Sequence, residues 1–355
     1  MKKFVVLFLV FGLTLTSLGG FPLSLAQTTE VSPVLTLSND IDYVGQYKIP
    51  VRLEDDMNRD QLEIGVMFND MANDFYVATL DAIKERASQR NVKLYVSTSN
   101  NSAGEEPGLM ENYLNMGVDG VITVFYASEG SADVMQKFKD QGIPSVNYIH
   151  ETRVFDYQLT SNNTQDGIDY ANAVINWVNT SDWSEKHLAD KETIKIAVGG
   201  LTLLESMGDR TRAIIDTFEK NLPNGEVVAI AEDIISSAIA YEWAETAIVQ
   251  NPDIDLWIGF CDVAALGIYE ALLSSGRTGD DCKVFGMDGT PDAINAMKKD
   301  DGLFEATLAV DAHENGYALL DAVIALNTGL ENELFGSYGN HNYYKIFWLD
   351  RYNLK

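Results

Sequence analysis

The sequence is poor in cysteine, histidine and basic residues. Its 355 residues include 2 cysteines and 4 histidines. Two cysteines exclude a disulfide scaffold and a cysteine-rich zinc or iron–sulfur module, and no two histidines stand at the i, i+4 spacing that holds zinc. The 25 Lys and Arg residues stand against 53 Asp and Glu, a formal charge of −28. A chain this acidic lacks the basic face that nucleic acid or an anionic membrane would require.

The short motifs of common catalytic sites are also missing. The sequence has no Gly-x-Ser-x-Gly elbow, no phosphate-binding P-loop and no His-Glu-x-x-His. Gly199-Gly200 and Gly286-x-x-Gly289 follow predicted strands, but neither completes a dinucleotide fingerprint. We therefore expect no enzyme, no cofactor and no metal site.

Long apolar runs are confined to the start of the chain. Two lysines precede an apolar run, and Ser24-Leu25-Ala26 supplies the small residues that a signal peptidase reads. We interpret residues 1–26 as a cleaved secretory signal; the alternative, an uncleaved anchor, is disfavoured because helix-breaking glycines and a proline follow a short run. No cysteine lies near Ala26, so no lipoprotein anchor is expected. The mature protein is predicted to be soluble and periplasmic or secreted, with residues 27–60 as a polar N-terminal extension.

From Leu62 onward, short apolar runs alternate with amphipathic, helix-like stretches. In the first such stretch Val77, Leu80 and Ile83 recur at helical spacing. Apolar strands that alternate with helices indicate α/β architecture with parallel sheets covered on both faces. Nine units are too many for one small core, so we predict two doubly wound parallel-sheet lobes. The predicted strands are Leu62–Phe68, Val92–Ser97, Gly120–Tyr126, Pro144–Ile149, Ile194–Val198, Val227–Ala231, Asp255–Phe260, Lys283–Met287 and Phe304–Val310.

The chain is expected to cross between the lobes more than once. A break is predicted near 157–165, and a second crossing near 305–312. The assignment is lobe 1 at 61–162 plus about 311–338, and lobe 2 at 163–310 plus about 339–355.

Aromatic, charged and amide side chains gather where the predicted strands end. In doubly wound sheets, ligands bind outside the carboxyl ends of the strands. Flat aromatic faces together with charged and amide groups suit a small polyhydroxylated or heterocyclic ligand. The candidate ligand-binding residues are Asn73, Phe75, Tyr76, Phe125, His150, Ser161, Arg212, Cys261 and Asp288.

Several motifs, in order and at matching spacing, carry a family resemblance over about residues 62–330. They are Asn73-Asp74-Phe75-Tyr76, Ser161-Asn162-Asn163, Arg210-Thr211-Arg212, Cys261-Asp262-Val263-Ala264-Ala265-Leu266-Gly267, Phe285-Gly286-Met287-Asp288-Gly289-Thr290-Pro291 and Ala306-Thr307-Leu308-Ala309. In these the chain resembles the type I periplasmic substrate-binding proteins of the ribose/galactose-binding class. The resemblance implies two lobes joined by a three-segment hinge that close around a sugar. It places Asn73, Phe75, Tyr76, Ser161, Arg212 and Asp288 at sugar-contacting positions.

The chain also departs from the family at contacting positions. Phe125, Ile149 and His150 stand where the family has polar groups, Cys261 replaces an asparagine, and Ile235 replaces a pocket-closing aromatic. A sugar that needs those partners would lose about 1–3 kcal/mol for each unpaired hydroxyl. A deoxy or methylated sugar, a furanose derivative or a heterocycle is therefore expected to fit better than ribose.

Structural alternatives remain open for each candidate. Phe75 and Tyr76 could be core residues of a helix start, Arg212 a surface arginine, and Asp288 a turn former. His150 could lie in a solvated loop, and Cys261 could be a buried, inert thiol. Cys261 and Cys282 fall at opposite ends of neighbouring strands, roughly 15 Å apart at about 3.3 Å per residue, so two free thiols are predicted.

The leading functional hypothesis is an exported solute-binding protein. It would deliver a small sugar-like ligand to an ABC permease and act as a monomer. The alternative is a periplasmic sensory subunit that presents its ligand state to a membrane receptor kinase; an enzyme is the third and weakest class.

Overall fold

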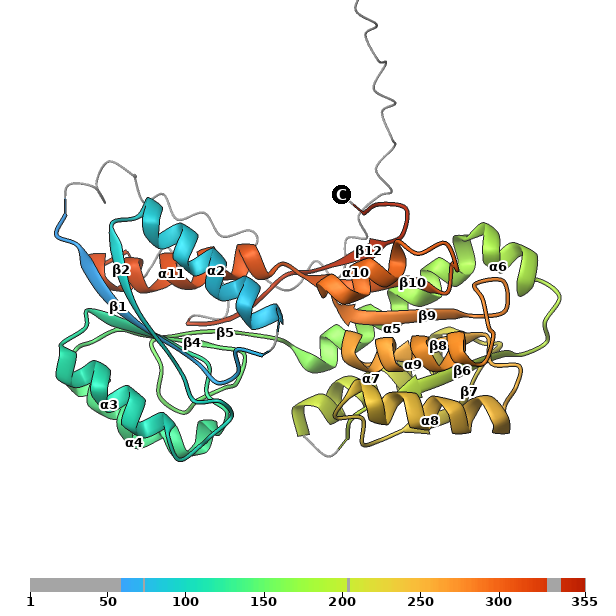
Figure 1. Ribbon diagram of the computed structural model, residues 1–355, viewed down its shortest axis with the longest axis horizontal. Coiled ribbons are helices and arrows are strands. Elements are labelled where there is room, and N and C mark those ends of the chain that lie inside the picture. The colour runs from blue at the N-terminus through green and yellow to red at the C-terminus, as the bar shows by residue number, and fades with distance from the viewer. Residues whose placement is uncertain (1–58, 73, 203–204, 331–339, 355) are drawn as a thin grey trace, which may run out of the picture. The chain divides into compact units, whose positions relative to one another are not determined.

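The structure, a computed structural model, describes residues 59–354 except 73, 203–204 and 331–339. The predicted signal and most of the predicted extension lie outside these residues. The described part folds into two six-stranded sheets with helices on both faces (Figure 1). Among the described residues, no helix is both long and apolar enough to cross a membrane.

The first sheet is wholly parallel. Its order is β11-β5-β4-β3-β1-β2. Helices α2 and α11 pack against each other on one face, and α3 and α4 cover the other (Figure 1). The elements are β1 (Leu62–Phe68), α2 (Asp74–Gln89), β2 (Val92–Thr98), α3 (Glu106–Met116), β3 (Gly120–Thr123), η2 (Ser128–Ser131), α4 (Ala132–Asp140), β4 (Ser145–Tyr148), β5 (Tyr157–Thr160), α11 (Ala312–Thr328) and β11 (His341–Tyr343).

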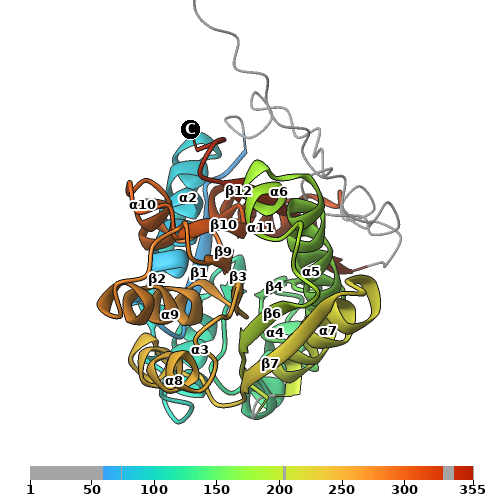
Figure 2. The same cartoon turned by 90° about the vertical axis from the view of Figure 1, so that its right-hand side faces the viewer.

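The second sheet is parallel except at one edge. Its order is β12-β10-β9-β8-β6-β7, and β12 runs antiparallel to β10. Figure 2 shows α8 and α9 on one side of this sheet and α5 and α7 on the other. The elements are α5 (Asn163–Thr180), α6 (Asp182–His187), β6 (Ile194–Gly199), α7 (Glu205–Asn221), β7 (Gly225–Ala231), α8 (Ser237–Gln250), β8 (Leu256–Gly259), α9 (Asp262–Ser274), β9 (Lys283–Asp288), α10 (Pro291–Met297), β10 (Phe304–Val310) and β12 (Ile346–Asp350).

The apolar runs form strands because the helices cover both faces of each sheet. Every residue of β3, β8 and β10 is buried, as the nearly continuous apolar runs predict. The core of the second sheet is strongly aromatic: the ring of Phe285 lies 5.1 Å from that of Trp177 and 6.1 Å from that of Trp348. The predicted fold class is confirmed.

The chain crosses between the sheets three times. The crossings lie between β5 and β6, between β10 and β11, and between β11 and β12. The prediction that residues from about 339 belong to lobe 2 needs a correction, because β11 pairs with β5 in the first sheet. The last crossing therefore falls between Tyr343 and Ile346, since a strand as short as β11 carries too little apolar pattern to show in the sequence.

Candidate functional site

A polar group forms at the carboxyl end of the second sheet and at the first and last crossings. Cys261 follows β8, and Asp288 ends β9. Arg210 comes from α7, Ser161 from the first crossing, and Tyr344 from the last. Arg210 lies near enough to Asp288, Cys261 and Tyr344 to interact with them electrostatically. This edge is where doubly wound sheets bind ligands.

Arg210 is a buried cation with weak partners. Its side chain is 4% exposed. Nη1 donates to the Phe260 carbonyl at 3.4 Å and Nη2 to Ser161 Oγ at 3.3 Å, both long, and Nε has no partner among the described residues. Helices α5 and α7 approach each other closely at Gly167, beside Arg210. A Cβ on residue 167 would lie 2.6 Å from the Arg210 carbonyl oxygen, so only glycine allows this close contact. A buried guanidinium with a free N–H can receive acceptor oxygens from a ligand.

Asp166 lies beside Arg210, in the first turn of α5. It is 2% exposed, and its Oδ2 accepts from Ser161 Oγ at 2.8 Å. Burial raises the pKa of Asp166 to about 6, although Arg210 and the Ser161 hydroxyl oppose the rise. Asp166 therefore titrates near neutrality.

Asp288 and Asp262 form a second acidic pair. Asp262 is wholly buried and accepts from the Thr290 N–H at 2.7 Å and from Thr307 Oγ1 at 2.8 Å, so its role is to fix the loop after β9. Burial, and then the neighbouring Asp262, raise the pKa of Asp288 to about 7. Asp288 is a half-buried residue at the end of β9.

Two non-glycine residues at strand ends hold strained backbone conformations. Ile149, directly after β4, has φ 62°, and Asp288 has φ 130°. A β-branched residue in the left-handed region is uncommon, and such strain concentrates where a site requires it. Both positions lie at carboxyl ends of strands, which supports a site at these edges.

Aromatic side chains extend from α2 toward the last crossing. The ring of Phe75 stacks on Tyr148 at 6.4 Å and 26°, and Tyr148 meets Tyr344 edge to face at 6.4 Å. Asn315 Nδ2 donates to the Tyr148 hydroxyl at 2.9 Å, which fixes that ring. Phe75 is half-buried, whereas Tyr76 is buried against Phe68. The core alternative therefore describes Tyr76, and Phe75 keeps an accessible ring that suits ligand contact.

The two arginines of Arg210-Thr211-Arg212 differ in burial, and the sequence prediction chose the exposed one, Arg212. Arg212 is exposed on α7 and pairs with Asp209 at 2.7 Å. Two residues along a helix are separated by about 200° of rotation. The two arginines therefore occupy opposite faces, and the one that packs toward the sheet is Arg210.

Phe125 is also corrected. It is fully buried in the core with Met67 and Met110, on the side of the first sheet that α3 and α4 cover. The next residue, Tyr126, is 56% exposed. The ring of Phe125 therefore contributes to packing and cannot contact a solvent-borne ligand here.

The other predicted residues divide between the sheets. Ser161, Cys261 and Asp288 gather around Arg210. His150 is partly exposed after β4, and burial lowers the pKa of its imidazole below the ordinary value of 6.5, which keeps it neutral at pH 7. Asn73 lies outside the described residues.

Sequence reasoning missed three residues of this group. Arg210 belongs to one of the family-like motifs, but the sequence does not show that Arg210, rather than Arg212, lies on the buried face of α7. Asp166 looked like an ordinary acid in a first helical turn, a position that the helix dipole favours. Tyr344 belongs to a segment with no motif, and no local signal indicates its place beside Arg210.

Both cysteines are free thiols, which confirms the prediction. Burial raises the pKa of Cys261 and of Cys282 to about 12, so neither is a reactive thiolate. Within the part of the chain that the structure describes, no three His, Cys, Asp or Glu side chains gather as a metal site would require.

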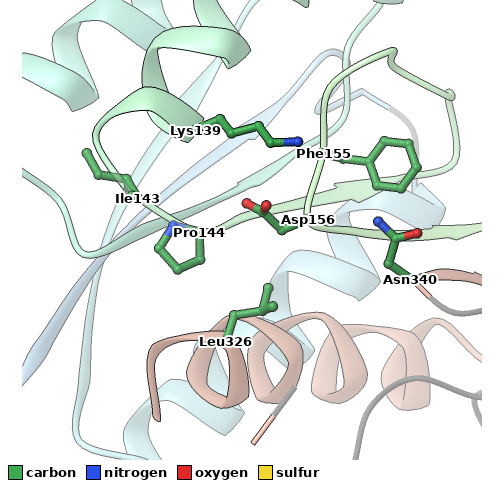
Figure 3. A pocket seen from close by; sticks show the side chains of 8 residues that line it. Lys139, Ile143, Pro144, Phe155, Asp156, Leu326 and Asn340 are labelled. Carbon is green, nitrogen blue, oxygen red and sulfur yellow. The ribbon is translucent and has the colours of Figure 1, made fainter. Parts of the chain in front are cut away.

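A separate surface pocket lies at the amino ends of β4, β5 and β11 (Figure 3). It encloses about 380 Å³ and is lined by Lys139, Gly142, Ile143, Pro144, Phe155, Asp156, Leu326 and Asn340. Its carboxylate, Asp156, already accepts from the N–H and hydroxyl of Ser145 at 2.8 and 3.0 Å. We assign this pocket no ligand.

The ligand-free protein should lose stability as the pH rises from about 4 to 6. Because burial raises the folded-state pKa of Asp166 to about 6, from the ordinary value of 3.8, the folded state holds a proton that the unfolded state releases near pH 4. This contribution is complete below pH 4 and disappears above pH 6. Asp166→Asn should flatten the pH dependence of the unfolding free energy by on the order of 2 kcal/mol between pH 4.5 and 8.

Urea unfolding followed by tryptophan fluorescence measures this difference, since all 5 tryptophans lie in elements of the second sheet or its helices. Parallel stability curves for wild type and Asp166→Asn would show that Asp166 titrates normally.

Comparison with known proteins decides the family. The family model of the periplasmic binding protein domain matches residues 64–331. The chain belongs to this family. Members of the family are binding proteins with a periplasmic location, so the predicted family is confirmed.

The curated relatives and solved structures share low sequence identity with this chain but match most of its length. The chain is 26% identical over 232 residues to the D-apiose import binding protein of Paraburkholderia graminis, covering 64% of this chain and 70% of that protein. It is 22% identical over 257 residues to the ribose import binding protein of Bacillus subtilis, covering 71% and 77%. The fold matches a Bacillus halodurans solute-binding protein with bound myo-inositol at TM-score 0.65, with 22% identity and 83% and 96% of the two chains covered. An Actinobacillus succinogenes protein with bound D-allose matches at TM-score 0.70 with 18% identity, covering 82% and 99%.

Proposed function

We propose that this protein is an exported solute-binding protein that captures a small sugar-like ligand between two lobes and delivers it to an ABC permease. The observation that carries the proposal is Arg210, buried at the carboxyl end of the second sheet, with long bonds to its two partners and an Nε that hydrogen-bonds to no other described residue. A ligand oxygen would complete its hydrogen bonding, and Asp288 would accept from a ligand hydroxyl.

The proposed site consists of Arg210, Asp288, Ser161, Cys261 and Phe75, with His150 and Asn73 as further contacts from the first lobe. Half-buried Phe75 offers a ring face to a sugar ring. Exposed Ile235, at 69%, follows β7 and offers an apolar contact instead of an aromatic one. This mixture suits a ligand with one less polar face, such as a deoxy or methylated sugar.

Relatives support import rather than sensing. Two curated relatives are named as import binding proteins, for D-apiose and for ribose. Neither of these two names describes a sensory partner of a receptor kinase. Signal cleavage near Ala26, the absence of a lipid anchor, a monomeric state and the lack of catalysis belong to the same proposal.

Ligand extraction followed by calorimetry tests the function. Protein purified without added sugar is denatured, and the released small molecules are identified by mass spectrometry. We expect a polyhydroxylated compound that binds again to the stripped protein, in a one-to-one complex. Failure of any polyhydroxylated compound to co-purify or to bind would contradict the proposal.

A further inference from the structure

The charges around Arg210 do not balance. Two buried or partly buried carboxyl groups, those of Asp166 and Asp288, lie near one guanidinium, and a third, that of Asp262, lies beside Asp288. Among the described residues, no lysine or arginine, Arg210 included, lies within ion-pair distance of any of the three. With all three ionised, the group would carry two uncompensated negative charges.

The neighbouring groups from other elements do not supply the missing positive charge. Asp288 is faced by Arg210 from α7, Asp262 from α9 and Asp166 from α5. The remaining titratable groups around it are Cys261, Tyr76, Tyr170 and Tyr344, all acids whose pKa values burial raises. His150 is neutral at pH 7. These groups are neutral or acidic, so the imbalance stands.

A buried, unpaired carboxylate is costly, and the protein limits the cost by holding protons on these groups. Burial is the first cause of the raised pKa values of Asp166 and Asp288, and neighbouring carboxyl groups add to the rise while Arg210 only partly opposes it. A neutral sugar would leave the imbalance in place. A ligand cation would remove it and allow both groups to ionise.

Arg210 adds a second requirement for the ligand, which is an acceptor oxygen. Its side chain is 4% exposed, and its Nε lacks a partner among the described residues. The guanidinium needs an acceptor, which a cation alone does not provide. The ligand must therefore carry oxygen atoms as well as positive charge.

Building on the proposed function, we propose that the ligand is a polyhydroxylated amine, an amino sugar or amino polyol. Its ammonium group lies against Asp166 and Asp288, and its hydroxyl or ring oxygens accept from Arg210. The formal charge of −28 favours this ligand class further, since it attracts cations to the protein.

Proton linkage follows from this arrangement. The ammonium lowers the pKa of both carboxyl groups in the complex, so binding releases protons. Because the free protein has a pKa of about 6 at Asp166 and about 7 at Asp288, affinity should rise with pH from 5 to 8 and then level off while the amine remains protonated.

The test compares amines with their neutral counterparts. The pairs are D-glucosamine with D-glucose, D-galactosamine with D-galactose, and 1-amino-1-deoxy-D-sorbitol with D-sorbitol. Calorimetry is done on stripped protein in phosphate, because Tris is itself a polyhydroxylated amine. Ligand extracted from the purified protein is analysed for basic nitrogen in parallel.

Tighter binding of an amine than of its neutral partner, or an extracted polyhydroxylated ligand with basic nitrogen, supports the inference. A neutral member that binds at least as tightly as its amine, or an extracted ligand without basic nitrogen, overturns it and leaves the sugar-binding function intact. If no member of either set binds and no polyhydroxylated compound is extracted, both the inference and the proposed function are wrong.

The Asp166→Asn variant tests whether the preference for an amine depends on Asp166 itself. It should weaken the best amine or the re-added extracted ligand at least about tenfold and reduce the pH dependence of its affinity. Asp216→Asn makes the same charge change at an exposed position of α7 and should leave the affinity unchanged. An equal loss in both variants would assign the effect to the general field of the protein and overturn the local pairing. If Asp166→Asn does not fold, the wild-type nitrogen analysis still decides the matter.

Discussion

Replacing Arg210 with alanine is expected to weaken ligand binding at least about a hundredfold, roughly 3 kcal/mol. The guanidinium is buried, and its Nε and two long hydrogen bonds leave it the donors that a ligand oxygen needs. Alanine removes these donors and takes away the cation that lies beside Asp166 and Asp288. Calorimetry with the extracted ligand measures the loss.

Arg212→Ala is the matched control. It removes the same side chain two residues away, on the opposite face of α7, where Arg212 pairs with Asp209 at the surface. Its affinity should stay within twofold of wild type, because exposed ion pairs contribute about 0–1 kcal/mol. If Arg212→Ala lost binding and Arg210→Ala kept it, Arg212 would be the ligand-binding arginine and the site around Arg210 would be wrong. Arg210→Lys keeps the charge and separates the role of the planar donors from that of charge alone.

Gly267→Ala should destabilise the second sheet and its helices strongly. Gly267 lies in α9, and a Cβ there would stand 2.2 Å from the Ser237 carbonyl oxygen and 2.6 Å from Ala240 Cβ. Helices α8 and α9 would have to move apart, at a cost of about 3 kcal/mol. Thermal unfolding followed by tryptophan fluorescence should show a midpoint lower by about 6–12 °C.

Gly108→Ala provides the opposite expectation for the same substitution. Gly108 lies in α3, and among the described residues no atom would lie within 4 Å of a Cβ added there. Alanine should stabilise that helix by about 0.5–1 kcal/mol, visible by circular dichroism. The unfolding transition followed by tryptophan fluorescence should not move in the Gly108→Ala variant.

Equal unfolding midpoints for Gly267→Ala and wild type would contradict the expected destabilisation, because they would show that α8 and α9 separate at little cost.

The local pattern of the chain accounts for most of the secondary structure. Continuous apolar runs such as Leu62–Phe68 and Phe304–Val310 form buried strands in the predicted places. The helix starts also follow local chemistry, as at Thr290, whose side chain accepts from the Ala293 N–H before the proline of α10. These features depend on neighbours in the sequence, so they can be predicted from it.

The site was less predictable, because its residues come from separate elements. Ser161, Cys261 and Asp288 could be proposed from the sequence because each lies at a strand end or at a crossing. Asp166 and Tyr344 were missed because their importance depends on burial beside Arg210, which no local pattern reports. Phe125 was placed at the site because it follows a strand, yet the side of the sheet that it faces is covered by α3 and α4.

The sequence by itself therefore determined the family, the two sheets and the free thiols, and it predicts a ligand at the strand ends. Tertiary structure decided which side of α7 is buried, since a two-residue step reverses the face of a helix and α5 packs closely on α7 where Gly167 meets Arg210. It also decided the charge of the site. A carboxyl group titrates according to its burial and its neighbours, and Asp166, Asp262 and Asp288 become neighbours only when the chain has folded.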